Sequence, residues 1–178
     1  DWPETVVSSA QLSHRSVNSM ADNIFIIGFS GTGKSCVGNQ VAQRLQAEFV
    51  DTDGEIEQQA SKTIPQIFSS DGEERFRAIE RSVIREVCNR RGLIVSTGGG
   101  AVLDSDNREL MISSGVVICL DAKPNTIFER LRRNESDDHS QAERPLLTGS
   151  NPLERIEALK EYREPFYGMA DWTIHTDD

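Results

Sequence analysis

The stretch Ile24-Phe-Ile-Ile-Gly-Phe-Ser-Gly-Thr-Gly-Lys-Ser35 decides the fold of this chain. Its last eight residues fit G-x-x-x-x-G-K-[ST], the phosphate-binding loop, with the apolar strand before it and the helical pattern after it that the motif requires. Glycines let backbone N–H groups turn inward around an anion, and the positive end of the following helix faces the same point. The sequence therefore predicts a loop that binds a nucleoside triphosphate. The reaction stays open, because ATPases, GTPases, kinases and nucleotide sensors share the motif.

Single residues of this loop have distinct expected roles. Lys34 supplies a mobile positive charge that can reach the outer phosphates, and the hydroxyl of Ser35 is placed to hold a magnesium ion. The candidate residues for ATP binding at the loop are Gly31, Thr32, Gly33, Lys34, Ser35 and Cys36.

The composition is that of a globular protein with an acidic surface. Of the 178 residues, 37% are hydrophobic and 27% are charged, and no apolar run is long enough to cross a bilayer. The net charge of −10, from 19 Lys and Arg against 29 Asp and Glu, is unsuited to gripping a polynucleotide. We therefore predict one domain with no membrane contact and no nucleic-acid partner, and a local cluster of arginines where a small anion binds.

The three cysteines, Cys36, Cys88 and Cys119, lack the spacing of a metal site, and two of them fall in apolar segments. This usage predicts reduced thiols in a cytoplasmic protein. For Cys36, beside the phosphate-binding loop, a packing role is the simpler interpretation.

Residues 1–22 show no sustained periodicity, and they lack the basic start and the apolar centre of a secretory signal. We interpret this segment as a linker, a tag or a fusion remnant. The folded domain is expected at residues 23–178.

Strands and helices alternate along that domain. Strands that are nearly all apolar predict a parallel sheet covered by helices on both faces, which is an α/β fold. The expected strands are residues 24–27, 49–53, 93–96, 116–120 and 172–175. The expected helices are residues 34–47, 55–60, 64–68, 73–89, 108–113, 124–132 and 152–167. Residues 134–143 contain no large apolar side chain, so we expect a mobile loop there.

Ligands of such sheets bind beyond the carboxyl ends of the strands, so the residues that follow each strand are candidates. Asp121 is one of them. Asp51 and Asp53 are two apart, so on an extended strand they point the same way. One can orient magnesium through water while the other accepts a proton from a substrate hydroxyl. Solvated aspartates at a strand end are the competing interpretation.

Three glycines, Gly98, Gly99 and Gly100, follow the strand expected at residues 93–96. Because glycine has no side chain to pack, such a run suggests that a ligand comes close to the backbone. A tight turn into the next helix explains the run equally well, so the residues alone leave both interpretations open.

Taken together, the motifs of this chain resemble those of the shikimate kinase family. They are Gly28 to Ser35, Asp51-Thr-Asp53, Gly72-Glu-x-x-Phe76-Arg77 with Glu80, Gly98-Gly99-Gly100, Arg144-Pro-Leu-Leu147 and Arg163-x-Pro-x-Tyr167. Beyond the phosphate-binding loop each motif is weak alone, but their shared order over about residues 23–176 is specific. The resemblance implies a three-layer sandwich with a five-stranded parallel sheet in the order 2-3-1-4-5, and a mobile lid at about residues 133–150.

The resemblance implies an ATP-dependent kinase that transfers the γ-phosphoryl group of ATP to the 3-hydroxyl of shikimate, on the route to chorismate and aromatic amino acids. Asp53 would take the hydroxyl that is phosphorylated, and Ser35 and Asp51 would serve Mg²⁺. Arg77 and Arg163 would hold the carboxylate of shikimate, because the arginine fork matches a planar anion.

The resemblance also implies roles for the glycine triplet and for the lid. Gly98, Gly99 and Gly100 would bind the substrate, and the N–H of Gly99 would meet a ring hydroxyl. Arg144 would swing in with the lid and stabilise the charge that develops on the phosphates. Glu80 would brace Arg77. The implied catalytic residues are Lys34, Asp53 and Arg144.

The sequence departs from the family pattern in two places. It ends at Asp178, before the helix that follows the last strand in relatives, so we assign no adenine contact. The expected lid is acidic, which leaves few arginines there to attract phosphates. Its acidic residues are Glu135, Asp137, Asp138 and Glu143, and the arginines are Arg132, Arg133 and Arg144. Covalent fusion to a neighbouring pathway enzyme is one hypothesis for both chain ends, and a monomer is expected for the isolated domain.

Two alternative functions stay open from the sequence. A kinase of the same fold that acts on gluconate would also use Arg77 and Arg163, since both arginines suit any carboxylate substrate. A non-catalytic relative that only binds nucleotide would have no use for Asp53 and Arg144, and the presence of both residues argues against it.

Overall fold

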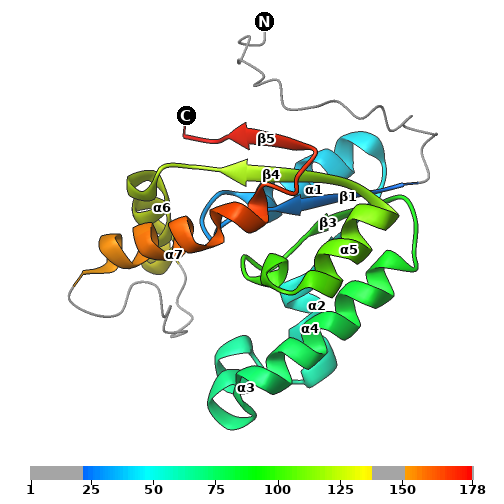
Figure 1. The fold of residues 1–178 in the computed structure, drawn as a ribbon, viewed down its shortest axis with the longest axis horizontal. Coiled ribbons are helices and arrows are strands. Elements are labelled where there is room, and N and C mark those ends of the chain that lie inside the picture. Colours follow the sequence, from blue (N-terminus) through cyan, green and yellow to red (C-terminus); the bar gives the residue numbers. More distant parts are fainter. Residues whose placement is uncertain (1–21, 138–150, 178) are drawn as a thin grey trace, which may run out of the picture.

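A computed structural model describes residues 22–137 and 151–177 of the chain. Its centre is a five-stranded sheet in which neighbouring strands are parallel, in the order β2-β3-β1-β4-β5 (Figure 1). The strands are β1 (Asn23–Ile27), β2 (Glu48–Asp51), β3 (Leu93–Ser96), β4 (Gly115–Asp121) and β5 (Trp172–His175). The predicted sheet and its strand order are confirmed.

The described part of the chain also contains every helix that the sequence predicts. The helices are α1 (Lys34–Leu45), α2 (Thr52–Ala60), α3 (Ile64–Ser70), α4 (Gly72–Cys88), α5 (Ser105–Ser114), α6 (Pro124–Asp137) and α7 (Pro152–Tyr167), with a 3₁₀ helix η1 (Ala101–Leu103) before α5. Several are longer than expected. Helix α5 begins early because the carboxylate of Asp104 accepts the N–H groups of Asp106 and Asn107 as an N-cap.

Two boundaries correct the expectations from sequence. The strand expected at residues 49–53 ends at Asp51, because the carboxylate of Asp51 accepts the N–H of Asp53 and so caps α2. Asp53 therefore lies in the first turn of a helix and not on an extended strand. The loop expected at residues 134–143 is helical as far as Asp137, and its remainder lies outside the described residues.

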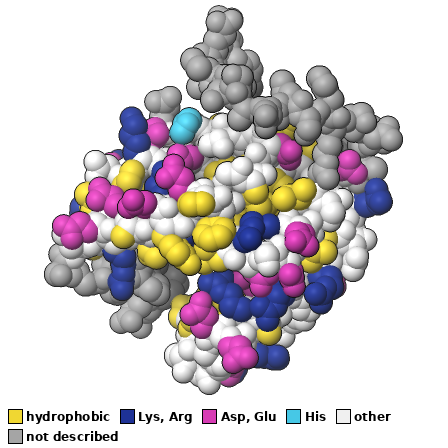
Figure 2. Space-filling model, viewed as in Figure 1, with side chains coloured by type: hydrophobic (Ala, Val, Ile, Leu, Met, Phe, Trp, Pro, Cys, Tyr) yellow, Lys and Arg dark blue, Asp and Glu magenta, His cyan; other side chains and the backbone are white. Residues whose placement is uncertain are grey.

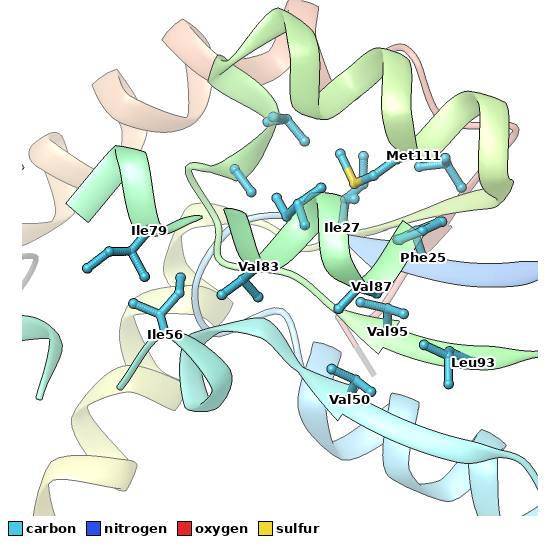
Figure 3. Packing of buried hydrophobic residues seen from close by; sticks show 14 of the residues in the cluster. Phe25, Ile27, Val50, Ile56, Ile79, Val83, Val87, Leu93, Val95 and Met111 are labelled. Atoms are coloured by element: carbon cyan, nitrogen blue, oxygen red, sulfur yellow. The ribbon is translucent and has the colours of Figure 1, made fainter. Parts of the chain in front are cut away.

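The two faces of the sheet pack against different helices, because side chains alternate between the faces of a strand. Phe25 and Ile27 of β1 and Val95 of β3 meet α4 and α5 in the largest apolar cluster (Figure 3). Ile26 and Ile94, from the same two strands, point to the other face and pack against α1. This arrangement is the predicted three-layer sandwich.

Strand β5 forms an exposed edge of the sheet. Trp172 keeps 45% of its surface exposed and Ile174 keeps 49%. Within the described residues, helices therefore cover both faces at the centre of the sheet and leave β5 exposed, at the edge where the sequence ends before the helix that follows the last strand in relatives. None of the helices in residues 22–137 and 151–177 combines the length and the apolar character needed to cross a membrane.

The register of the sheet brings the carboxyl ends of its strands to one rim. Ile26 of β1 and Asp51 of β2 both pair with Ser96 of β3, and Asp121 of β4 pairs with His175 of β5. The phosphate-binding loop, the start of α2 and the glycine triplet therefore leave the sheet side by side.

Candidate active site

The phosphate-binding loop connects β1 to α1. Gly31 and Gly33 have φ angles of 82° and 92°, which L side chains rarely adopt, so both turns need glycine. The turns lead into the first turn of α1, where N–H groups have no acceptor one turn earlier in the helix. Cys36 lies in that turn and is exposed, so the packing role expected for this thiol is wrong.

Lys34 is buried in this loop, with 8% of its surface exposed. Its Nζ donates to the carbonyl oxygen of Phe29 at 2.9 Å, and the hydroxyl of Thr32 donates to the same oxygen at 2.8 Å. Burial lowers the pKa of Lys34 to about 8, while Asp53 and then Asp51 oppose the shift. The ammonium group therefore lies within electrostatic reach of both predicted carboxylates.

Ser35 and Asp51 form the candidate magnesium site. Ser35 Oγ donates to Asp51 Oδ2 at 2.6 Å, and Ser96 Oγ lies 3.3 Å from Ser35 Oγ. Mg²⁺ prefers oxygen ligands and keeps several waters, so a hydroxyl and a carboxylate beside bound phosphates fit this ion. Within the described residues, no three His, Cys, Asp or Glu side chains cluster to hold a metal by themselves. The geometry fits an ion that protein and nucleotide hold jointly.

Asp53 has a different environment from Asp51. Burial raises the pKa of Asp53 to about 6, the negative charge of Asp51 adds to the rise, and Lys34 opposes it. A carboxylate with a pKa near neutrality is suited to accept a proton during a reaction. The two aspartates thus come together as expected, although a helix cap and not an extended strand positions them.

The glycine triplet after β3 touches all three side chains that were expected to bind the acceptor. A β-carbon at each glycine would come close to one of them. From the position of such a β-carbon, the distance is 2.6 Å at Gly98 to Asp53 Oδ1 and 3.5 Å at Gly99 to Arg163 Nη1. At Gly100 it is 3.1 Å to both Nη1 and Nη2 of Arg77. A side chain at Gly98 or Gly100 would crowd Asp53 or Arg77, whereas the distance at Gly99 is ordinary contact with Arg163. The triplet therefore packs against these groups, and the close approach of a ligand to it stays a prediction.

The same triplet also contacts the phosphate-binding loop and the start of α2. A β-carbon at Gly99 would lie 3.3 Å from the N of Ser30 and 3.4 Å from the O of Gly28. The N–H of Gly98 donates to Thr52 Oγ1 at 3.1 Å, and Thr52 is fully buried. One short turn therefore separates the expected nucleotide site from the expected acceptor site.

Arg77 on α4 is held by carboxylates. Its Nη1 donates to Glu80 Oε2 at 2.8 Å, and its Nη2 lies 3.3 Å from Glu73 Oε1. The side chain of Glu80 is only 2% exposed. Burial raises the pKa of Glu80, and the ion pair with Arg77 opposes that rise. The expected contact between Glu80 and Arg77 is therefore present.

Arg163 on α7 is held in another way. No ion pair within the described part of the chain includes it. Its Cζ lies 5.3 Å from the ring centroid of Phe29, and its Nε is buried without a hydrogen-bond partner among the described residues. The hydroxyl of Tyr167, one turn later, donates to the O of Gly99 at 2.7 Å. Arg163 therefore has no ion-pair partner among the described residues, although its charge opposes the rise that burial causes in the pKa of Glu80, and its side chain hydrogen-bonds to Tyr167.

Arg77 and Arg163 supply the local positive charge that the acidic composition predicts for an anionic substrate. Figure 2 shows Lys and Arg side chains gathered beside a strip of apolar ones on one face of the molecule. Arg144, the third expected arginine, lies outside the described residues, as do residues 138–150 of the expected lid.

Sequence reasoning missed three residues that build this site. The hydroxyls of Ser96 and Thr52 lie where strands end, and polar residues at strand ends are a signal that could have identified both. Phe29 gives no such signal, because the loop motif accepts any residue at its position. Tyr167 was part of a recognised motif, but its hydrogen bond to the glycine triplet could not be read from the pattern.

Comparisons with known proteins identify the family of this chain. A family model for shikimate kinase matches residues 30–178. The chain is 43% identical over 157 residues to a shikimate kinase of Actinobacillus pleuropneumoniae, which spans 88% of this chain and 87% of that protein. It is 42% identical over 154 residues to a shikimate kinase of Pelotomaculum thermopropionicum, which spans 86% of both chains. A solved structure of shikimate kinase from Acinetobacter baumannii in complex with shikimate matches with a TM-score of 0.80 and 37% identity, over 88% of this chain and 84% of that one.

Proposed function

The chain belongs to the shikimate kinase family, and from this premise we propose how its own residues transfer phosphate to shikimate. Its activity is that of an ATP-dependent phosphotransferase with shikimate as acceptor. The gluconate kinase and the non-catalytic relative are therefore set aside. The observation that best supports the residue assignment is the contact of Gly98–Gly100 with Asp53, Arg163 and Arg77.

The nucleotide side of the site is the phosphate-binding loop. Backbone N–H groups from Gly31 to Cys36 surround the phosphates, and Lys34 adds its charge to the outer ones. Ser35 and Asp51 would hold Mg²⁺, which neutralises phosphate oxygens when it is bound. Arg144 from the lid is proposed to contact the phosphoryl group that is transferred.

The acceptor side of the site holds a carboxylate and a ring hydroxyl. Arg77 and Arg163 approach consecutive glycines, so a carboxylate beside the triplet can meet both guanidinium groups. The N–H of Gly99 is proposed to donate to a ring hydroxyl of shikimate. These contacts orient the 3-hydroxyl toward Asp53, next to Gly98.

The reaction then needs little covalent participation by the protein. The 3-hydroxyl oxygen of shikimate attacks the γ-phosphorus, the bond from that phosphorus to the β–γ bridging oxygen breaks, and ADP leaves. The proton of the attacking hydroxyl goes to the carboxylate of Asp53. The negative charge of the transferring group is balanced by Lys34 and the proposed Arg144.

We also propose the remaining features of the working protein. It acts in the cytoplasm, as a monomer when isolated, and residues 23–178 form its folded domain. Residues 133–150 close over the bound substrates and expel water. Residues 1–22 serve as a linker, a tag or a fusion remnant.

The function is tested by measuring ADP release from ATP and Mg²⁺ with shikimate, its methyl ester or gluconate as acceptor. Shikimate should react efficiently and gluconate should not. The Arg77→Ala and Arg163→Ala variants should each raise KM for shikimate about 10- to 100-fold, because a charged hydrogen bond contributes about 1.5–3 kcal/mol. KM for ATP should change far less.

The ester makes the test specific to the carboxylate. The native chain should prefer the acid to the ester, and each arginine variant should lose most of that preference. Arg75→Ala, on the same helix but exposed, removes one positive charge and serves as the matched control. Equal losses for ATP and shikimate, or an unchanged preference for the acid, would contradict the assignment of these arginines.

A further inference from the structure

Phe29 lies in the phosphate-binding loop, yet its ring points into the protein and is 1% exposed. The ring packs in a small apolar cluster beyond the ends of the strands, against residues that include members of α6 and α7. The other buried members of this cluster are Ala122, Ile127, Leu131 and Ile156. Phe29 therefore joins the nucleotide loop to two helices, one of which bears Arg163.

The ring of Phe29 and the guanidinium group of Arg163 form a cation–π pair, with Cζ 5.3 Å from the ring centroid. Such a pair gains strength when water is excluded, and this ring is buried. Arg77 also lies over a ring, with Cζ 5.2 Å from the centroid of Phe76, but it differs in that two carboxylates fix its guanidinium group. In the described structure no ion pair includes Arg163, so its restraints are the aromatic face of Phe29 and a side-chain hydrogen bond with Tyr167.

The backbone of Phe29 faces the nucleotide side. Its carbonyl oxygen accepts hydrogen bonds from Lys34 Nζ and from the Thr32 hydroxyl. One residue thus contacts Lys34 through its backbone and Arg163 through its side chain. These two contacts can be separated experimentally, because a substitution at Phe29 removes the ring and keeps the carbonyl.

We propose that Phe29 is a positioning residue whose ring holds the Arg163 guanidinium group in place for the acceptor carboxylate. It thereby ties the geometry of the acceptor site to the loop that binds ATP. An aromatic face holds a cationic group without placing an opposite charge in contact with it, whereas a carboxylate does place one there. This inference rests on the proposed role of Arg163 in binding shikimate.

The test is a double-mutant cycle of Phe29→Leu and Arg163→Ala, with KM for shikimate and for ATP as the readouts. Phe29→Leu alone should raise KM for shikimate about three- to tenfold, the range that a buried cation–π contact supports. KM for ATP should stay within about twofold, because the carbonyl partner of Lys34 remains. In the Arg163→Ala background, Phe29→Leu should leave KM for shikimate unchanged.

The cycle separates failure of the inference from failure of the proposed function. If Arg163→Ala leaves shikimate binding intact, the proposed role of Arg163 is wrong. If Arg163→Ala weakens binding but Phe29→Leu has the same effect in both backgrounds, the positioning role of Phe29 is wrong.

Loss of packing is controlled within the same apolar cluster. Ile156→Val thins the cluster and keeps the ring, so it should leave KM for shikimate unchanged; an increase equal to that of Phe29→Leu would overturn the inference. Phe29→Met keeps the volume without the ring and is used in the cycle if circular dichroism shows Phe29→Leu to be unfolded. The preference for shikimate over its methyl ester should fall in the Phe29 variants and not in Ile156→Val.

Discussion

Lys34 is buried and Asp53 is half-buried beside it, and desolvation moves their pKa values toward neutrality from opposite sides, to about 8 and about 6. The proposed transfer needs Asp53 ionised and Lys34 protonated. We therefore expect kcat/KM for shikimate to rise as the pH increases through about 6 and to fall as it increases through about 8. ADP release measured from pH 5 to pH 9.5 at constant ionic strength checks this, and a flat profile between pH 5 and pH 7 would contradict the assignment of Asp53.

The Asp53→Asn variant should bind nucleotide without turnover. Its stability at different pH values tests the raised pKa of Asp53 independently of the reaction rate. The pKa of Asp53 in the folded state lies above its ordinary value of 3.8. The folded state therefore holds the proton of Asp53 more tightly than the unfolded state does. The stability that this proton contributes is fully present below about pH 4 and is lost as the pH rises through about 6. The amide side chain in this variant is neutral at every pH. The variant should therefore be more stable than the native chain at pH 8, by at most about 3 kcal/mol. No such gain is expected at pH 4, and thermal unfolding at both pH values measures the difference.

At the scale of elements, the turn formed by the glycine triplet sets the spacing of the site. A β-carbon at Gly98 would lie 2.6 Å from Asp53 Oδ1, so Gly98→Ala must push the carboxylate away. We expect kcat to fall about 10- to 100-fold, because a displacement of about 1 Å at a reacting group can cost that much. KM for ATP should change little.

Gly54, next to Asp53 on α2, offers the matched control. A β-carbon at Gly54 meets nothing within 4 Å, and the residue lies inside a helix. Gly54→Ala should therefore keep kcat and add about 0.5–1 kcal/mol of stability. If both alanine variants lose activity equally, the space beside Gly98 is not what positions Asp53.

Elements with strong local signals could be predicted from the sequence. The phosphate-binding loop, the apolar strands and the amphipathic helix α4 each follow from a short pattern, and each lies where it was expected. The start of α2 could not be predicted, because Asp51 can continue a strand or cap a helix and the pattern does not decide between them. Because of this cap, Asp53 lies in a helix, and it is still adjacent to the carboxylate of Asp51.

The exposure of helix faces and the contacts between distant segments were not predicted correctly from the sequence. Tyr162 follows other apolar residues of α7 at intervals of three, yet it is 62% exposed, because six residues after the buried Ile156 a helix has turned it to another face. The pairing of Phe29 with Arg163 joins positions far apart in the chain, and neither residue alone indicates it. Family resemblance named Arg163 as a ligand but could not say what holds it.

At the scale of the whole molecule, the parallel sheet has two rims with different tasks. The rim at the carboxyl ends gathers Lys34, Asp53 and the glycine triplet. At the opposite rim, Asn23 begins β1 and is fully buried. Its Nδ2 donates to the O of Arg90 at 2.9 Å, and its Oδ1 accepts the N–H of Leu93 at 3.0 Å. Asn23 therefore ties β1 to the end of α4 and the start of β3, away from the reacting groups.

This separation predicts a variant that loses stability and keeps activity. Asn23→Ala leaves a buried N–H and a backbone carbonyl without their partner, so it should lower the free energy of unfolding by about 2–4 kcal/mol. Urea denaturation measures the loss, and kcat at about 15 °C, where the variant stays folded, should match the native value. The neighbouring Asp22→Ala removes only an exposed ion pair with Arg91 at 3.8 Å and should cost less than about 1 kcal/mol. A large fall in kcat for folded Asn23→Ala would mean that the two rims are coupled, because strain at the start of β1 would then reach the loop at its end.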